Sequence, residues 1–104
     1  MLTAEQARLK ARNDMVVYNE IKAIELAIIQ ASSDGELDVT VATTEMTNGE
    51  TAPAYYNEWK GTAPNVILRD RMNQVIASFT KLGYTLDRKT NQGTGDTFVW
   101  IAAW

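Results

Sequence analysis

The sequence predicts an α+β domain in which a small three-stranded sheet packs on helices, with the elements in the order α-β-α-β-β. The chain has 104 residues, of which 45% are hydrophobic and 22% charged. This is the size and balance of one globular domain, spanning residues 1–104. The chain opens with a long segment of helical periodicity and closes with a strand that is apolar on both faces. These observations together indicate the α+β class.

The first helix is expected over residues 3–32. Thr3 and Gln6 have the spacing of a capping box, and Gly35 follows Ser33 and Asp34 where helices commonly end. At 1.5 Å per residue this helix would be about 45 Å long, so its first turns are expected to overhang the core of the domain. One apolar stripe is expected to face that core: Val17, Ile21, Ile24, Ile28 and Ala31.

A second stripe on this helix is the main candidate for a contact with another protein. Its members are small or apolar and recur at helical spacing, interrupted by Lys22: Ala4, Ala7, Ala11, Met15, Tyr18, Leu26 and Ile29. Small residues at such spacing let a second helix approach closely. The alternative interpretation is that alanine simply favours helices.

A strand is expected over residues 36–42, where Leu37, Val39 and Val41 alternate with polar residues and share one face. A long connector, residues 43–61, follows it. Within this connector, residues 54–60 are expected to form one or two helical turns that stop at Gly61.

The aromatic residues of this connector have two interpretations. They are typical of a lid packed over an edge of the core. The alternative is a loop that binds a carbohydrate or another small ligand. The candidate ligand residues are Tyr55, Tyr56, Glu58 and Trp59.

The second half of the chain predicts a helix followed by a hairpin. The helix is expected over residues 62–82, with Pro64 in its first turn and Gly83 at its end. Its apolar residues recur at spacings of four and three: Leu68, Met72, Val75, Phe79 and Leu82. Strands are expected over residues 84–88 and 97–104, joined by a hairpin loop over residues 89–95.

The last strand is expected to lie in the middle of the sheet, because both of its faces are apolar. One face carries Phe98, Trp100, Ala102 and Trp104, and the other carries Val99, Ile101 and Ala103. With the helices on one side of the sheet, the second face would stay open unless a second copy or another protein covers it. Val99, Ile101 and Ala103 are therefore candidate interface residues.

Composition argues against several function classes. Ten Lys and Arg against thirteen Asp and Glu give a net charge of -3, which argues against nucleic acid as a partner. A third alternative is a single-stranded nucleic-acid site built on Arg69, Arg71, Arg88 and Lys89. Cys and His are absent, which removes thiol nucleophiles, imidazole bases and the usual zinc ligands. We therefore expect no enzyme activity, no cofactor and no metal.

The sequence also bears on location. The first residues lack the charged and apolar regions of a signal peptide, and no apolar stretch is long enough to span a bilayer. We expect a soluble protein with no membrane partner.

The second half of the chain carries a pattern that resembles small uncharacterised proteins of tailed bacteriophages, including marine and cyanobacterial phages. The pattern comprises Met72-Asn73-Gln74-Val75-Ile76, the run from Phe79 to Leu86, Thr97-Phe98-Val99-Trp100-Ile101 and Trp104, with Met46-Thr47, Tyr56 and Trp59 upstream. The resemblance brings no catalytic residues. It implies a small phage structural or assembly protein. The second stripe of the first helix and the two apolar faces of the last strand predict that such a protein, in the host cytoplasm or the virion, self-associates or binds another phage protein.

Overall fold

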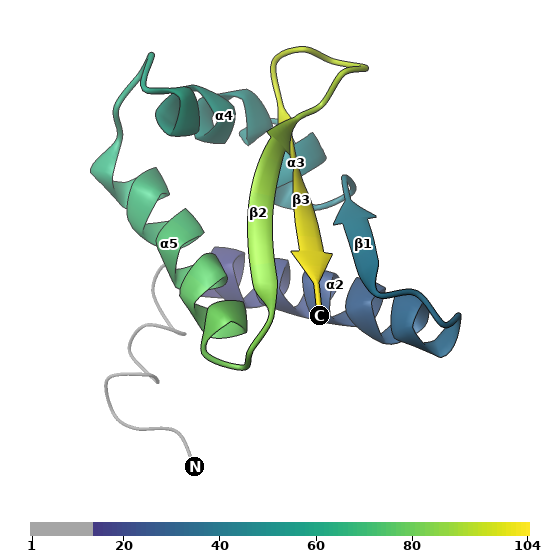
Figure 1. Cartoon of the computed structure of the whole chain (residues 1–104). Helices are drawn as coiled ribbons and strands as arrows, with labels where there is room; N and C mark the ends of the chain where they lie inside the picture. The colour runs from purple at the N-terminus through teal and green to yellow at the C-terminus, as the bar shows by residue number, and fades with distance from the viewer. Residues whose placement is uncertain (1–13) are drawn as a thin grey trace, which may run out of the picture.

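The last strand of the chain lies at the centre of the sheet, as its two apolar faces predict. In the computed structural model, β3 (Phe98–Ala103) pairs antiparallel with β1 (Asp38–Val41) on one side and with β2 (Thr85–Thr90) on the other. Strands β1 and β2 therefore run parallel to each other, and the chain that connects them passes across β3 on one face of the sheet (Figure 1). Ala102 marks the register, because it lies opposite both Val39 and Leu86.

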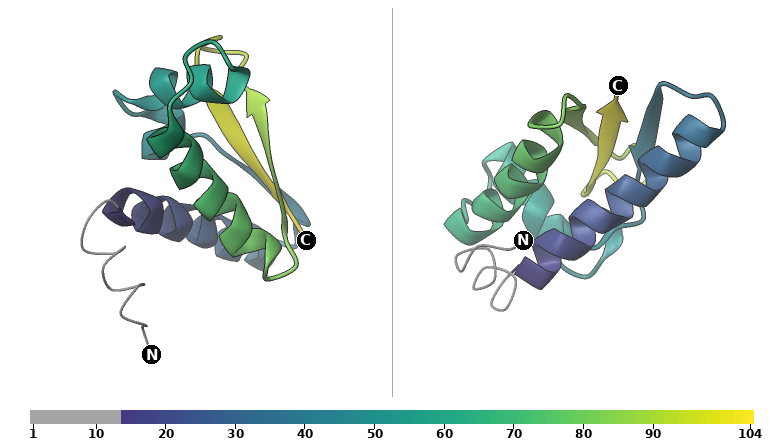
Figure 2. Two further views of the ribbon diagram at one scale, coloured as in Figure 1. Left: turned by 90° about the vertical axis from the view of Figure 1, so that its left-hand side faces the viewer. Right: turned by 90° about the horizontal axis from the view of Figure 1, so that it is seen from below.

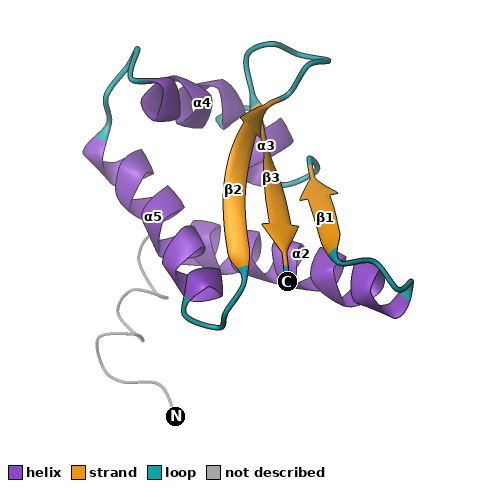
Figure 3. Ribbon diagram, viewed as in Figure 1, coloured by secondary structure: helices purple, strands orange, loops and turns teal. Residues whose placement is uncertain are grey.

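The structure describes residues 14–104 and confirms the α+β class. The predicted capping box at Thr3 and Gln6 lies outside the described residues. The helices are α2 (Asp14–Ser33), α3 (Glu45–Asn48), α4 (Ala52–Lys60) and α5 (Val66–Thr80). Figure 3 shows that most of the chain between β1 and β2 is helical.

Helix α2 ends where the sequence predicts. The Glu36 amide donates to the Ala31 carbonyl at 2.9 Å, and Gly35 between them adopts a φ of 82°. This left-handed residue closes the helix, and a side chain is disfavoured there.

Strand β1 is shorter than the predicted range of 36–42. Leu37 was expected to point inward with Val39 and Val41, but it lies before the strand and is 70% exposed. Its carbonyl accepts a hydrogen bond from the Trp104 amide at 3.1 Å. The apolar alternation wrongly predicts that Leu37 points inward, because this residue precedes the strand, where the chain turns after α2.

The connector confirms the predicted helical turns and adds a helix that the sequence did not predict. Helix α4 ends at Gly61, whose φ is 83°. Helix α3 precedes it and begins with a capping box formed by Thr44 and Thr47. It has four residues, too few for apolar periodicity to indicate it.

Helix α5 begins later and ends earlier than the predicted range of 62–82. Its N-cap is Asn65, whose side chain accepts a hydrogen bond from the Leu68 amide at 3.2 Å. Leu82 continues the apolar spacing but is 72% exposed, because the helix ends at Thr80 and the chain turns at Gly83.

The hairpin is displaced by about two residues from its predicted position. Strand β2 reaches Thr90, and the Asn91 amide still donates to the Thr97 carbonyl at 2.8 Å. The loop therefore lies at residues 92–96 rather than 89–95.

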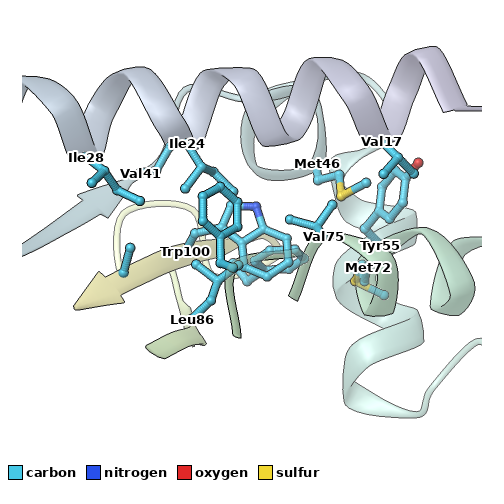
Figure 4. Close-up of a cluster of buried hydrophobic side chains, with 13 residues drawn as sticks. Val17, Ile24, Ile28, Val41, Met46, Tyr55, Met72, Val75, Leu86 and Trp100 are labelled. Atoms are coloured by element: carbon cyan, nitrogen blue, oxygen red, sulfur yellow. The ribbon is translucent and has the colours of Figure 1, made fainter. Parts of the chain in front are cut away.

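The core lies between the sheet and the helices, which cover one face of it (Figure 2). Trp100 is fully buried beneath Ile24 of α2 and close to Val75 of α5 (Figure 4). Its ring contacts Phe98 edge to face, with ring centroids 5.0 Å apart. The inward face of β3 thus fills the centre of the domain.

Candidate functional site

The outer face of α2 carries exposed apolar side chains, as the second stripe predicts. The exposed fractions are 51% for Met15, 37% for Tyr18, 67% for Leu26 and 53% for Ile29. The other members, Ala4, Ala7 and Ala11, lie outside the described residues. A row of exposed apolar side chains on a single helix is a candidate contact surface.

Two charged side chains occupy the middle of this row. The Lys22 Nζ atom lies 3.6 Å from the Glu25 Oε1 atom, and about half of each side chain is exposed. The same Nζ atom lies 5.6 Å from the centroid of the Tyr18 ring. The outer face of α2 therefore has an apolar patch at each end and one ion pair between them.

The outer face of the sheet is a narrower apolar surface than the sequence predicts. Val99 is buried, whereas Ile101 and Ala103 are half-buried. Exposed polar residues of β1 and β2 flank this row: Asp38, Thr40, Thr85, Asp87 and Lys89. No helix of residues 14–104 covers this face (Figure 2).

The candidate ligand residues lie on a helix and contact the rest of the domain. Tyr55 is 1% exposed, and its hydroxyl accepts a hydrogen bond from Arg71 Nη1 at 3.2 Å. Tyr56 lies within hydrogen-bonding distance of Thr90, with 3.2 Å between their hydroxyl oxygens. Trp59 packs edge to face on Phe98, with ring centroids 5.8 Å apart. The aromatic residues of α4 therefore close one edge of the core, as the lid interpretation predicts.

Glu58, the fourth candidate ligand residue, is held by the start of α5. Its Oε1 accepts a hydrogen bond from Arg69 Nε at 2.7 Å, and its Oε2 accepts one from the Asn65 amide at 2.6 Å. The Arg69 guanidinium and the Asn65 amide lower the pKa of Glu58. The carboxylate thus joins α4 to α5.

The arginines of the predicted basic patch turn toward α4. Arg69 pairs with Glu58, and Arg71 donates to Tyr55. The Arg88 guanidinium lies 5.5 Å from the centroid of the Trp59 ring, and burial lowers its pKa. Each of these arginines therefore already has a partner within the chain.

A buried carboxyl group at Glu20 is the polar centre that the sequence analysis missed. Glu20 is 1% exposed. Its Oε2 accepts hydrogen bonds from Thr44 Oγ1 at 2.5 Å and from Trp100 Nε1 at 2.7 Å. Its Oε1 accepts a longer one from the Met46 amide, at 3.4 Å. One side chain of α2 therefore joins the start of α3 and the centre of the sheet.

Burial raises the pKa of Glu20 above its ordinary value of 4.5. The hydrogen bonds from Thr44, Trp100 and Met46 oppose that effect without cancelling it, and the nearby Glu45 adds to it. The sequence does contain a signal for this site. Glu20 lies three residues after Val17 and four before Ile24, so it falls on the core stripe of the helix.

Neither a metal site nor a membrane-spanning helix finds support in the described part of the chain. Residues 14–104 contain no group of three or more side chains able to hold a metal ion. None of the helices in this range combines the length and apolar character needed to cross a membrane.

Comparisons with known proteins give no family for this chain. No family model, no curated protein and no solved structure matches it. The resemblance to phage proteins therefore stays an expectation.

Proposed function

We propose that this protein is a non-catalytic structural or assembly protein that acts through protein–protein contacts and self-association. The observation that supports the proposal is the outer face of α2. Met15, Leu26 and Ile29 are each more than half exposed there. The opposite face of the same helix is buried in the core through Val17, Ile24 and Ile28. A helix that is apolar on both faces gains stability when a partner covers the second one.

The outer face of the sheet is proposed as a second, smaller contact. Ile101 and Ala103 form its half-exposed apolar centre, and the polar residues of β1 and β2 form its rim. An apolar centre with a polar rim is the usual anatomy of a protein interface.

The setting of the proposal rests on the sequence resemblance. It places the protein in a tailed bacteriophage, in the virion or in the host cytoplasm during assembly. The partner is then a second copy of the chain or another phage protein.

Light scattering on a sizing column, at two protein concentrations, tests the self-association. We expect a mass above the 11.6 kDa of one chain, rising with concentration. A variant that combines Leu26→Glu with Ile29→Glu should return the mass to that of a monomer, because charge on an apolar surface opposes its burial.

The matched control combines Val66→Glu with Ile67→Glu. These residues lie on α5 and are 65% and 60% exposed, much like Leu26 and Ile29. The control should leave the mass unchanged. A wild-type chain that stays monomeric at both concentrations would refute self-association, and an equal loss of mass in both variants would refute the assignment to α2.

A further inference from the structure

The exposed residues of α2 have a spacing that reads the same in both directions. Met15, Tyr18, Lys22, Leu26 and Ile29 follow one another at intervals of three, four, four and three residues. At 100° per residue, all of them lie within about 40° of the direction in which Lys22 points. Reversing the helix about Lys22 therefore exchanges Met15 with Ile29 and Tyr18 with Leu26.

We propose that α2 packs antiparallel on α2 of a second copy of this chain, about a two-fold axis at Lys22. The inference rests on the proposed function and specifies its partner. A two-fold interface uses the same patch on both chains, so that patch must complement its own reversed copy. The symmetric spacing on α2 meets this condition, which a contact with an unrelated protein would not require.

In this arrangement the apolar side chains of one helix lie level with those of the other. Met15 lies level with Ile29 of the second copy, and Tyr18 lies level with Leu26 of the second copy. These residues are 37% to 67% exposed in the single chain, so the contact would cover apolar surface at both ends of the helix. Figure 2 shows α2 along the outside of the molecule.

In the antiparallel arrangement Lys22 faces Lys22 of the second copy on the axis, and the nearby glutamates offset the repulsion between the two lysines. Each Lys22 would lie one helical turn from Glu25 of the second copy, while keeping its ion pair of 3.6 Å within its own chain. The axis would then carry two positive and two negative charges. A parallel pair would set both Lys22 against Lys22 and Glu25 against Glu25, whereas the antiparallel pair separates the two Glu25 residues by about 9 Å along the helix.

The contact is short, so we expect the dimer to be weak. It runs along about four turns of one helix, and a standard interface buries about 800 Å² per partner. We therefore expect a dimer that dissociates on dilution.

Single cysteine substitutions test the geometry, because the chain has no cysteine of its own. Helices in contact have axes about 8–10 Å apart, which brings the two residues on the axis within disulfide range. The variant Lys22→Cys should therefore form a disulfide with itself under mild oxidation. Met15→Cys and Ile29→Cys should not do so alone, because the two copies of each residue lie about 21 Å apart along the helix. A mixture of Met15→Cys and Ile29→Cys proteins should form the mixed disulfide.

The variant Ile67→Cys is the matched control, since Ile67 is 60% exposed on a different helix. The proposal expects several-fold more cross-linked dimer from Lys22→Cys than from this control, measured on a non-reducing gel. Equal cross-linking of Lys22→Cys, Met15→Cys and Ile29→Cys would show a parallel pair and overturn the proposal.

A charge swap gives a second, independent readout. Lys22→Glu would place four carboxylates around the axis and should shift the dimer to monomer. Adding Glu25→Lys restores two charges of each sign and should restore the dimer. Failure of the double variant to recover the dimer would contradict the central charge cluster.

The outcomes separate this inference from the proposed function. If the wild type is a dimer by light scattering and Lys22→Cys cross-links no better than Ile67→Cys, self-association stands and the α2 pairing is overturned. If the wild type is monomeric at both concentrations and no cysteine variant cross-links above the control, both are overturned.

Discussion

The two buried glutamates among residues 14–104 lie in opposite electrostatic situations. Glu20 is at the centre of the core and receives hydrogen bonds from a hydroxyl, an indole and a backbone amide, none of which is charged. Glu58 is at the junction of α4 and α5 and receives a hydrogen bond from the Arg69 guanidinium. The pKa of Glu20 is raised above its ordinary value, and the pKa of Glu58 is lowered below it.

The two carboxyl groups differ in the charge of their hydrogen-bond donors. Both side chains are nearly excluded from solvent, with residue exposures of 1% for Glu20 and 6% for Glu58. A cation next to Glu58 compensates the charge, whereas neutral donors next to Glu20 compensate it only in part. Arg69 can provide that cation because its own side chain is half exposed and stays hydrated.

The largest expected effect is the loss of stability in Glu20→Ala. The substitution leaves the Trp100 indole N–H buried without its acceptor and opens a space beside Ile24. An unsatisfied buried donor costs about 1–3 kcal/mol. Urea unfolding followed by circular dichroism would measure this difference. Glu25→Ala, on the exposed side of the same helix, is the control when both variants are measured at a concentration where the protein is monomeric. Equal effects of the two substitutions would then contradict the structural role of Glu20.

The pH dependence of stability should show the raised pKa of Glu20. The folded state holds this proton more tightly than the unfolded chain, so the stability that Glu20 contributes is fully present below pH 4.5. It is lost as the pH rises through the raised pKa of the folded state. In Glu20→Gln the amide oxygen still accepts the Trp100 hydrogen bond without titrating.

The difference in unfolding midpoint between the wild type and Glu20→Gln measures this effect. The wild type should lose stability relative to the variant as the pH is raised from 4.5. A difference that stays constant with pH would contradict the raised pKa.

Glu58 should show a smaller effect with the opposite sign. Its pKa is lowered, so its contribution to stability is present above pH 4.5 and is lost as the pH falls through the folded-state pKa. The variant Glu58→Gln should therefore be less stable than the wild type at neutral pH and approach it in acid. Thermal unfolding of both proteins at neutral and acidic pH would measure this, and a gap that widens in acid would contradict the ion pair with Arg69.

The sequence predicts those parts of the fold that depend on a long apolar pattern or on a glycine that ends a helix. The central position of β3 follows from its two apolar faces, and the end of α4 follows from Gly61. Leu37 and Leu82 are misplaced because their apolar spacing continues beyond the ends of the elements. Spacing shows which residues share a face but not where a helix or strand stops.

The candidate sites were predictable to different degrees. The exposure of Met15, Leu26 and Ile29 follows from the second stripe of α2, because the core stripe fixes which way the helix faces. The partners of Tyr55 and Glu58 depend on how α4 packs against α5, and pairs so far apart in the sequence leave no local signal. Glu20 was missed because the core stripe was defined from apolar residues alone.

Glu25 completes the comparison and gives the smallest expected effect on folding. Like Glu58 it has a cationic partner, but 48% of its side chain is exposed, as is 50% of its partner Lys22. Exposed ion pairs are worth less than about 0.5 kcal/mol on a helix, because water already solvates both charges. Glu25→Gln should therefore change the free energy of unfolding by no more than that, measured in urea at a concentration where the protein is monomeric. A larger loss in the monomer would mean that this ion pair supports the fold of α2 itself. A small loss, together with a weaker dimer in light scattering, would place its role in association.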